Sequence, residues 1–147
     1  MLQVVQVDSG NWDAYMKLRH HVFCVERDVP EEIQVDSYDT LTGCAEHFMI
    51  LKDGSAAGAF RCRPEGTLIH LQRFCVLASQ RKQGLGRAML RHAQSRYQAL
   101  GYQKLVFEAK FSAKPFYEKC GCITVSDIFM EVGLPHVKME LPLQENS

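Results

Sequence analysis

The sequence predicts a single α/β (α+β) domain over residues 1–147, and three observations carry this prediction. A chain of 147 residues, 46% of them hydrophobic, is the right size to form one core. Strand-like and helix-like segments alternate in the order β-α-β-β-β-α-β-α-β-β. Asp53-Gly54 separates two strand-like runs and is a strong hairpin signal, because both positions of a type I′ turn need positive φ.

The first half of the chain predicts one long helix and four strands. Apolar residues recur at helical spacing from Trp12 to about Glu26, and Pro30 prevents continuation of the helix. The acidic segment 31–46 has little periodicity and indicates a loop or short helical turns. The predicted strands are Leu2–Val7, His47–Lys52, Ser55–Arg63 and Thr67–Val76.

The second half predicts two helices and three strands. An apolar stripe with basic residues between its members begins at Gly86, as is typical of an amphipathic helix, and Gly101 is suited to end it. A shorter helix carries Phe116 and Tyr117 and ends at Gly121. The predicted strands are Lys104–Ala109, Ile123–Met130 and His136–Leu141.

Whole-chain charge selects no class of partner, because 17 Lys and Arg residues balance 17 Asp and Glu residues. The distribution is uneven, however. The segment from Gly66 to Phe107 has seven basic residues and no acidic one, whereas Glu26–Glu46 has seven acidic residues and one basic one. A basic block can hold an anionic ligand and an acidic block a cationic one, and ordinary solvated faces are the alternative.

Cysteines and hydropathy argue against several classes of protein. The six cysteines stand in a chain without a signal-peptide pattern, so we expect reduced thiols and a cytoplasmic protein. Cys120-Gly121-Cys122 lacks the C-x-x-C spacing of zinc and redox sites, so we expect no metal. No apolar run approaches the roughly 20 residues that cross a bilayer, so we expect no membrane partner.

The most specific motif is Arg81-Lys82-Gln83-Gly84-Leu85-Gly86-Arg87, between a predicted strand and the basic helix. Two glycines let the backbone curve closely around a ligand, and the first N–H groups of a helix have no internal partner. Such a turn suits a pyrophosphate. The Walker motif and the dinucleotide-binding fingerprint do not match, and a glycine turn without any ligand is the alternative.

Two motifs resemble the GNAT acetyltransferases. Arg81-x-x-Gly84-x-Gly86 is similar to their [QR]-x-x-G-x-[GA] signature, and it stands between the fourth predicted strand and the long helix, as in that fold. Pro115–Gly121 is similar to their P-F-Y-x-x-x-G-[FY] segment. The order of elements resembles theirs over nearly the whole chain. The resemblance implies the GNAT fold, a single mixed, mostly antiparallel central sheet of six to seven strands flanked by helices.

Three further segments resemble the ElaA/YjcF-like branch of this family. They are Val22–Arg27 with Pro30, Asp36 with Asp39, and Gly133–Met139. The chain departs from the family pattern at three positions: Arg27 replaces Gln, Cys122 replaces an aromatic residue, and Lys110 stands where relatives often have Gln.

The resemblance implies an N-acetyltransferase with acetyl-CoA as co-substrate. The acetyl group would pass to a primary amine by direct attack in a ternary complex. The expected acceptor is a small-molecule or peptide amine, and the acidic block motivates a cationic one. A non-catalytic CoA-binding regulatory module is the alternative. We expect no nucleic-acid partner, because a stacking aromatic platform and a recognised motif are missing, and a homodimer stays open.

The resemblance also implies where coenzyme A binds. In this family a bulge splays the fourth strand from the fifth and opens the cofactor slot. Backbone groups of the fourth strand would flank the pantetheine arm, and the glycine turn would hold the pyrophosphate. The implied cofactor-binding residues are Phe74, Cys75, Val76, Arg81, Lys82, Gln83, Gly84, Leu85, Gly86 and Arg87.

Acetyl transfer needs a base for the amine and an acid for the departing thiolate. Tyr117 matches the family tyrosine that acts as general acid, and a core aromatic residue is the alternative. Glu26, His47 and His136 are the candidates for the base, each expected near the acceptor cleft, and a structural hydrogen bond is the alternative for each. A covalent route through Cys75 would need an activated thiolate.

Overall fold

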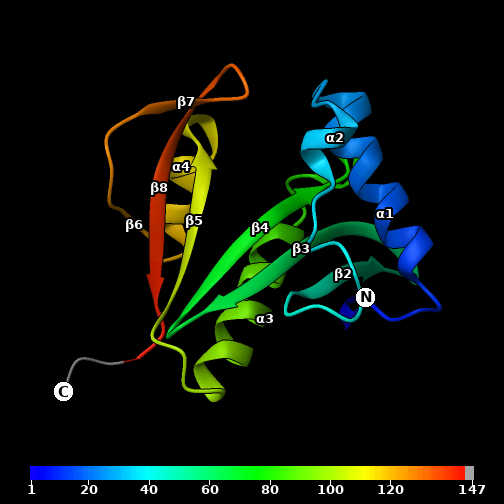
Figure 1. Ribbon diagram of the computed structural model, residues 1–147, viewed down its shortest axis with the longest axis horizontal. Coiled ribbons are helices and arrows are strands. Elements are labelled where there is room, and N and C mark those ends of the chain that lie inside the picture. Colours follow the sequence, from blue (N-terminus) through cyan, green and yellow to red (C-terminus); the bar gives the residue numbers. More distant parts are fainter. Residues whose placement is uncertain (145–147) are drawn as a thin grey trace.

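One eight-stranded sheet organises the chain in the computed structural model, which describes residues 1–144 (Figure 1). Its order is β1-β2-β3-β4-β5-β8-β6, and β7 pairs with β8 outside this path. All neighbours are antiparallel except β4 and β5. The strands are β1 Leu2–Gln6, β2 Glu46–Lys52, β3 Ser55–Glu65, β4 Leu68–Val76, β5 Lys104–Lys110, β6 Ile123–Thr124, β7 Phe129–Glu131 and β8 Leu134–Pro142.

Four α-helices and three other helical segments cover this sheet. They are α1 Trp12–His20, the π-helical η1 His21–Glu26, α2 Glu31–Gln34, the 3-10 turn η2 Ala78–Gln80, α3 Leu85–Ala99, the 3-10 turn η3 Phe111–Ala113 and α4 Lys114–Lys119. The predicted mixed α/β fold with a mostly antiparallel sheet is therefore confirmed.

Three element predictions need correction. The helix expected from Trp12 to Glu26 changes to π-helical geometry at His21. The strand expected over Ile123–Met130 is two short strands, β6 and β7, joined by a loop, so the sheet has one strand more than expected. The strand expected over Ser55–Arg63 continues to Glu65, so Pro64 lies within β3. Pro64 stands beyond Cys62, where the pairing of β3 with β2 ends, so the N–H group that proline lacks is not needed for a bond to β2.

The helices form two layers, with α1 on one face of the sheet and α3 and α4 on the other (Figure 1). Alternate side chains of β2 divide between the two cores: Phe48 packs with α3 and α4, and Met49 packs with α1. Because both faces are covered, β3 is buried continuously over residues 57–62.

The sheet opens between β4 and β5. The two strands pair only between residues 68–70 and 104–106, and beyond this point they diverge (Figure 1). On the other side of β4, Arg73 and Phe74 together face the single β3 residue Phe60, which is a β-bulge. Arg73 has φ +54° at this bulge. The bulge that the family resemblance implied is therefore present.

Candidate active site

The diverging ends of β4 and β5 open into a cavity of about 1170 Å³. Its walls include the end of β4, the glycine turn, β5, α4 and the β7–β8 hairpin. All of the predicted cofactor-binding residues except Gln83 line it. The side chain of Gln83 instead contacts Lys52 and the Ser79 carbonyl. Most of the predicted cofactor residues therefore meet in one place.

The glycine turn forms the start of α3 within this cavity. Gly84 is the N-cap with φ +86°, and its carbonyl accepts the first helical hydrogen bond, from the Ala88 N–H at 3.1 Å. In the part of the chain that the structure describes, the N–H groups of residues 85–87 have no partner. A second conformational constraint lies at Gly86, where an added Cβ would be 3.1 Å from the Phe116 ring. The turn therefore presents free donors at a positively polarised helix end, which suits a phosphate.

The arginine of the signature is already engaged within the protein. Arg81 donates through Nε to the Val76 carbonyl at 3.1 Å and through Nη2 to Glu26 at 2.9 Å. Glu26 also accepts a long bond of 3.5 Å from the Ala78 N–H. Glu26 thereby ties η1 to the glycine turn, and it is not among the described residues that line the cavity. Lys82 and Arg87 line the cavity and make no ion pair within residues 1–144.

Tyr117 lies between the bulged strand and β5. Its side chain is 8% exposed, and its ring contacts Phe74, Phe107 and Phe116 at centroid distances of 5.9, 4.7 and 5.0 Å. Burial raises the pKa of the phenol above its usual value, so the hydroxyl stays protonated at neutral pH. In residues 1–144 this hydroxyl has no hydrogen-bond partner, and the residue lines the cavity.

His136 lies on β8 in the opposite wall. It is 7% exposed, lines the cavity and pairs across the sheet with Lys110. Its Nδ1 is 2.8 Å from the Leu134 carbonyl, which can only accept, so Nδ1 carries the proton. The Nε2 of the neutral ring therefore keeps its lone pair, and it lies 3.8 Å from Glu131. This geometry leaves His136 able to accept a proton.

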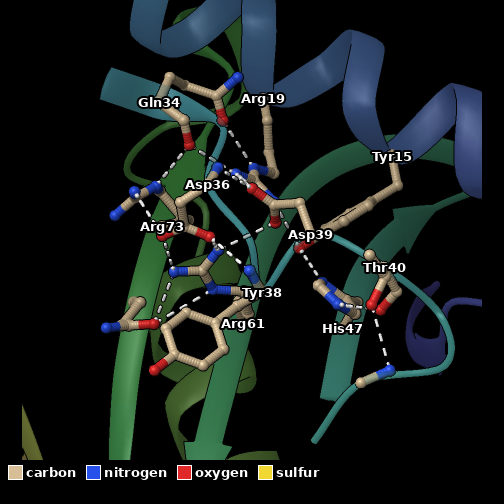
Figure 2. Close-up of polar contacts among 12 residues, drawn as sticks. Tyr15, Arg19, Gln34, Asp36, Tyr38, Asp39, Thr40, His47, Arg61 and Arg73 are labelled. Atoms are coloured by element: carbon tan, nitrogen blue, oxygen red, sulfur yellow. Dashed lines mark hydrogen bonds and ion pairs between the residues drawn. The ribbon is translucent and has the colours of Figure 1, made fainter. Parts of the chain in front are cut away.

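The expectation that His47 faces the acceptor cleft is wrong, because both of its ring nitrogens are used inside the protein (Figure 2). The Tyr15 hydroxyl donates to Nδ1 at 2.8 Å, and Nε2 donates to the Thr40 carbonyl at 3.1 Å. The ring is 2% exposed, and burial lowers its pKa. His47 is therefore a structural residue beneath α1.

A buried ion network next to His47 holds the wall of the cavity (Figure 2). Arg19 and Arg61 are both 0% exposed. Arg19 binds both oxygens of Asp39, at 2.6 and 3.1 Å, and Arg61 binds both oxygens of Asp36, at 2.7 and 2.9 Å. The two halves join where Arg61 also reaches Asp39 at 2.9 Å.

Arg73 connects this network to the bulge (Figure 2). Its guanidinium donates to the carbonyls of Gln34 at 2.8 Å and Ile33 at 3.1 Å, at the C-terminal end of α2, and it approaches Asp36 at 3.3 Å. Gln34, Asp36 and Arg73 all line the cavity. The network therefore fixes α2 against the strained residue of β4 and sets the width of the opening.

Two carboxylates of the cavity wall were missed by the sequence reasoning. Glu108 on β5 and Glu131 on β7 both line the cavity. The Glu131 carboxylate raises the pKa of Glu108 because it can accept a hydrogen bond from the protonated form of Glu108, and burial and the Glu131 charge act in the same direction. A signal was present in the sequence, since Glu108 lies in the predicted strand Lys104–Ala109 and would share a face with Lys110 if that strand continued by one residue. Their closeness to His136 depends on the pairing of β5 with β8, which the sequence does not state.

The cysteines show no sign of nucleophilic chemistry. Cys75 is 2% exposed, and burial raises the pKa of its thiol to about 12. This opposes the activated thiolate that a covalent route needs. None of the six cysteines is paired in a disulfide.

His20, Cys24 and Glu31 meet outside the cavity, with their polar atoms within 4.8 Å of one another. His20 Nδ1 is 2.5 Å and Cys24 Sγ 3.0 Å from one oxygen of Glu31. Burial and Glu31 raise the pKa of Cys24 to about 11. The closeness of the three side chains is thus accounted for by hydrogen bonds to one carboxylate.

A family model described as the acetyltransferase (GNAT) domain matches residues 22–143. The uncharacterized N-acetyltransferase YjcF of Bacillus subtilis strain 168 is 31% identical over 123 residues, which are 83% of this chain and 86% of that protein.

Two solved structures share the fold. A putative N-acetyltransferase from Lactobacillus plantarum has a TM-score of 0.88 at 25% identity, over 97% of this chain and 99% of that one. Escherichia coli ElaA has a TM-score of 0.83 at 22% identity, over 96% and 98% of the two chains.

Within the described residues, no helix has the length and apolar character to cross a membrane.

Proposed function

The chain belongs to the GNAT acetyltransferases, in the ElaA/YjcF-like branch, and is thus an acyltransferase, and we propose that it transfers the acetyl group of acetyl-CoA to a primary amine by direct attack in a ternary complex. One observation carries this proposal. The free N–H groups at the start of α3, the Tyr117 hydroxyl and the Nε2 edge of His136 all belong to residues that line one cavity.

The residues of this cavity suit the binding of the acetyl donor. The pyrophosphate of coenzyme A would accept from the N–H groups of Leu85, Gly86 and Arg87, with Lys82 adding charge. The pantetheine arm would run along β4 at Phe74, Cys75 and Val76, where the strand pairs with β3 on one side and no longer pairs with β5 on the other. This arrangement would bring the thioester between the bulge and Tyr117.

Two side chains, His136 and Tyr117, take part in the proposed transfer step. The neutral amine attacks the thioester carbonyl carbon, so a C–N bond forms and the carbonyl oxygen gains charge. His136 Nε2 takes the proton that the nitrogen loses. The C–S bond then breaks, and the thiolate leaves with a hydrogen bond and a proton from Tyr117. The products are an N-acetyl amide and free coenzyme A, and proton exchange with solvent restores both side chains.

The acidic segment Glu26–Glu46 motivated a cationic acceptor, but several of its carboxylates are already paired within the protein. Asp36 and Asp39 bind buried arginines, Glu26 binds Arg81, and Glu46 binds Arg96 at 2.6 Å. The carboxylates that line the cavity near the reaction centre are instead Glu108 and Glu131. We therefore assign them the task of attracting the amine before it loses its proton.

The test is release of free thiol from acetyl-CoA across a panel of primary amines. We expect turnover with at least one amine, and we expect Tyr117→Phe to lower kcat with that amine by about 10²-fold or more, because the thiolate loses its proton donor. The KM for acetyl-CoA should change little. Tyr102→Phe is the matched control, since Tyr102 does not line the cavity, and it should retain the wild-type kcat.

The alternative of a regulatory module predicts a different result. Such a protein would bind coenzyme A in calorimetry and release no thiol with any amine. Equal kcat values for Tyr117→Phe and the wild type would refute the assignment of Tyr117 as the acid.

A further inference from the structure

Arg27 and Lys110 line the cavity, and neither has an anionic partner within residues 1–144. Arg27 ends η1, and its guanidinium lies over the Phe23 ring at 5.1 Å. Lys110 is the last residue of β5. Within residues 1–144, neither side chain makes a hydrogen bond or an ion pair with another residue. The other cavity-lining lysines and arginines without an ion pair in this part of the chain are Lys82 and Arg87 of the glycine turn and Lys119 of α4, so Arg27 and Lys110 are the two that lie on other elements.

Arg27 and Lys110 line the same cavity, and Lys110 lies directly opposite His136, the proposed base. Burial lowers the pKa of Lys110, and the charges of Arg27 and Arg81 lower it further. Burial likewise lowers the pKa of Arg27. Holding unpaired cations together in a partly buried site costs free energy, and a bound anion would offset this cost.

The charges of the cavity wall alternate in sign. Lys110 lies directly opposite His136 across β5 and β8, and Glu108 stands two residues before Lys110 on the same face. Glu131 raises the pKa of Glu108, and its carboxylate lies 3.8 Å from Nε2 of His136. A carboxylate pair beside the proposed base is therefore next to a pair of free cations. A ligand with one positive and one negative group matches this wall, whereas a polycation would be repelled by Arg27 and Lys110.

We propose that the acetyl acceptor is an aminocarboxylate of the amino-acid class, whose carboxylate binds Arg27 and Lys110 while its amino group meets Glu108, Glu131 and His136. This inference rests on the proposed function, because it names the substrate class of the same site. The phosphates of coenzyme A have separate donors at the start of α3 and at Lys82. Lys110, by contrast, is on β5 directly opposite His136, the proposed base.

The experiment compares matched acceptors that differ only in the carboxylate. Thiol release from acetyl-CoA is measured with alanine, leucine and phenylalanine, with their amides, and with the corresponding decarboxylated amines. We expect kcat/KM to be at least about tenfold higher for at least one free amino acid than for its amide. Arg27→Gln and Lys110→Gln should each reduce this ratio toward one.

Lys104→Gln is the matched control. Lys104 is on the same strand and the same face as Lys110, but it binds Glu140 and does not line the cavity. It should keep the wild-type ratio. Thermal unfolding of each variant checks that the fold is retained.

The outcomes separate failure of the inference from failure of the proposed function. Turnover of the amides or simple amines that equals or exceeds that of the amino acids overturns the inference and leaves the transferase intact. Absence of turnover with every amine overturns the proposed function. Calorimetry with coenzyme A and an amino acid or its amide then tests the inference alone, and equal or undetectable binding of the two overturns it.

Two further results would also overturn the acceptor assignment. Preference for succinyl-CoA over acetyl-CoA that is lost in Arg27→Gln would place the carboxylate on the acyl donor. A raised KM for acetyl-CoA in both variants, with an unchanged acceptor ratio, would assign the two cations to the phosphates of coenzyme A.

Discussion

His136 shows how a single side chain acquires a chemical role from its neighbours. The Leu134 carbonyl fixes the proton on Nδ1, so the lone pair of the neutral ring is on Nε2. His47 has the same side chain, but its Nδ1 already accepts from Tyr15, and burial lowers its pKa. Only His136 of these two is able to take a proton from a ligand in the cavity.

Replacement of His136 by glutamine tests this role. We expect His136→Gln to lower kcat/KM by about 10²-fold or more at neutral pH, because the amine loses its base. His20→Gln, an exposed change on α1, is the control and should keep the wild-type kcat/KM. An unchanged kcat/KM in His136→Gln would exclude His136 as the base.

At this scale the sequence predicted the motif residues better than the base. Tyr117 and Gly84 are defined by short local motifs, so their place in the fold follows from the sequence around them. The position of a base depends on contacts between segments far apart in the chain. His47 and His136 both stand near the start of a strand. Only the sheet register and the layer of α1 decide that His47 is enclosed beneath α1 and that His136 lines the cavity.

At the scale of elements, the turn between β4 and α3 needs a backbone conformation that favours glycine, and it also forms part of the cavity wall. Gly84 has φ +86° at the start of α3, and Gly101 has φ +89° after its end. An added Cβ would meet no atom within 4 Å at either position. The two glycines are therefore equally constrained by backbone conformation, but only Gly84 lines the cavity.

This symmetry gives a matched pair of variants. Gly84→Ala and Gly101→Ala should each lower the free energy of unfolding by about 1 kcal/mol, because alanine is strained at positive φ. Only Gly84→Ala should also raise the KM for acetyl-CoA, since its methyl group would stand in the proposed pyrophosphate site. Urea unfolding and initial-rate kinetics measure the two effects. Equal KM values in the two variants would argue against pyrophosphate binding at this turn.

The element types followed from the sequence, and their irregularities did not. Hydrophobic spacing predicted the helix that begins at Trp12. It did not predict the π-helical geometry of η1, because over only six residues the wider turn leaves almost the same spacing of apolar side chains. The break between β6 and β7 was missed because Val125 and Ile128 are apolar although both are exposed. The β4 bulge was expected from the family resemblance and not from any residue of the strand.

At the scale of the whole molecule, the buried network joins segments that are far apart in the sequence. Arg19 comes from α1, Asp39 from the loop after α2, Arg61 from β3 and Arg73 from β4 (Figure 2). The acidic segment was expected either to attract a cationic ligand or to be an ordinary solvated face, and two of its seven acidic residues, Asp36 and Asp39, serve this network instead. A charge count cannot distinguish these uses, because the distinction depends on which arginines are folded against the segment.

Asp39 links the stability of the molecule to pH. Burial alone would raise its pKa, but hydrogen bonds and charge from Arg19, together with the charge of Arg61, lower it from 3.8 to about 2. Because the folded pKa is below the unfolded one, the stabilisation is fully present above pH 4 and is lost as the pH falls toward 2. This group should contribute about 2 kcal/mol of stability at neutral pH.

Asp39→Asn tests this linkage at neutral and acidic pH. At pH 7 it should lower the free energy of unfolding by about 3–5 kcal/mol, because Arg19 would remain buried without its partner. Between pH 4 and pH 2 the wild type should lose about 2 kcal/mol more stability than the variant, which has no carboxylate to protonate at this position. Urea unfolding across this range measures both quantities, with Asp127→Asn in an exposed loop as the control. A loss below about 1 kcal/mol at pH 7, or parallel pH profiles for the two proteins, would show that the network does not hold α1 to the sheet as its geometry indicates.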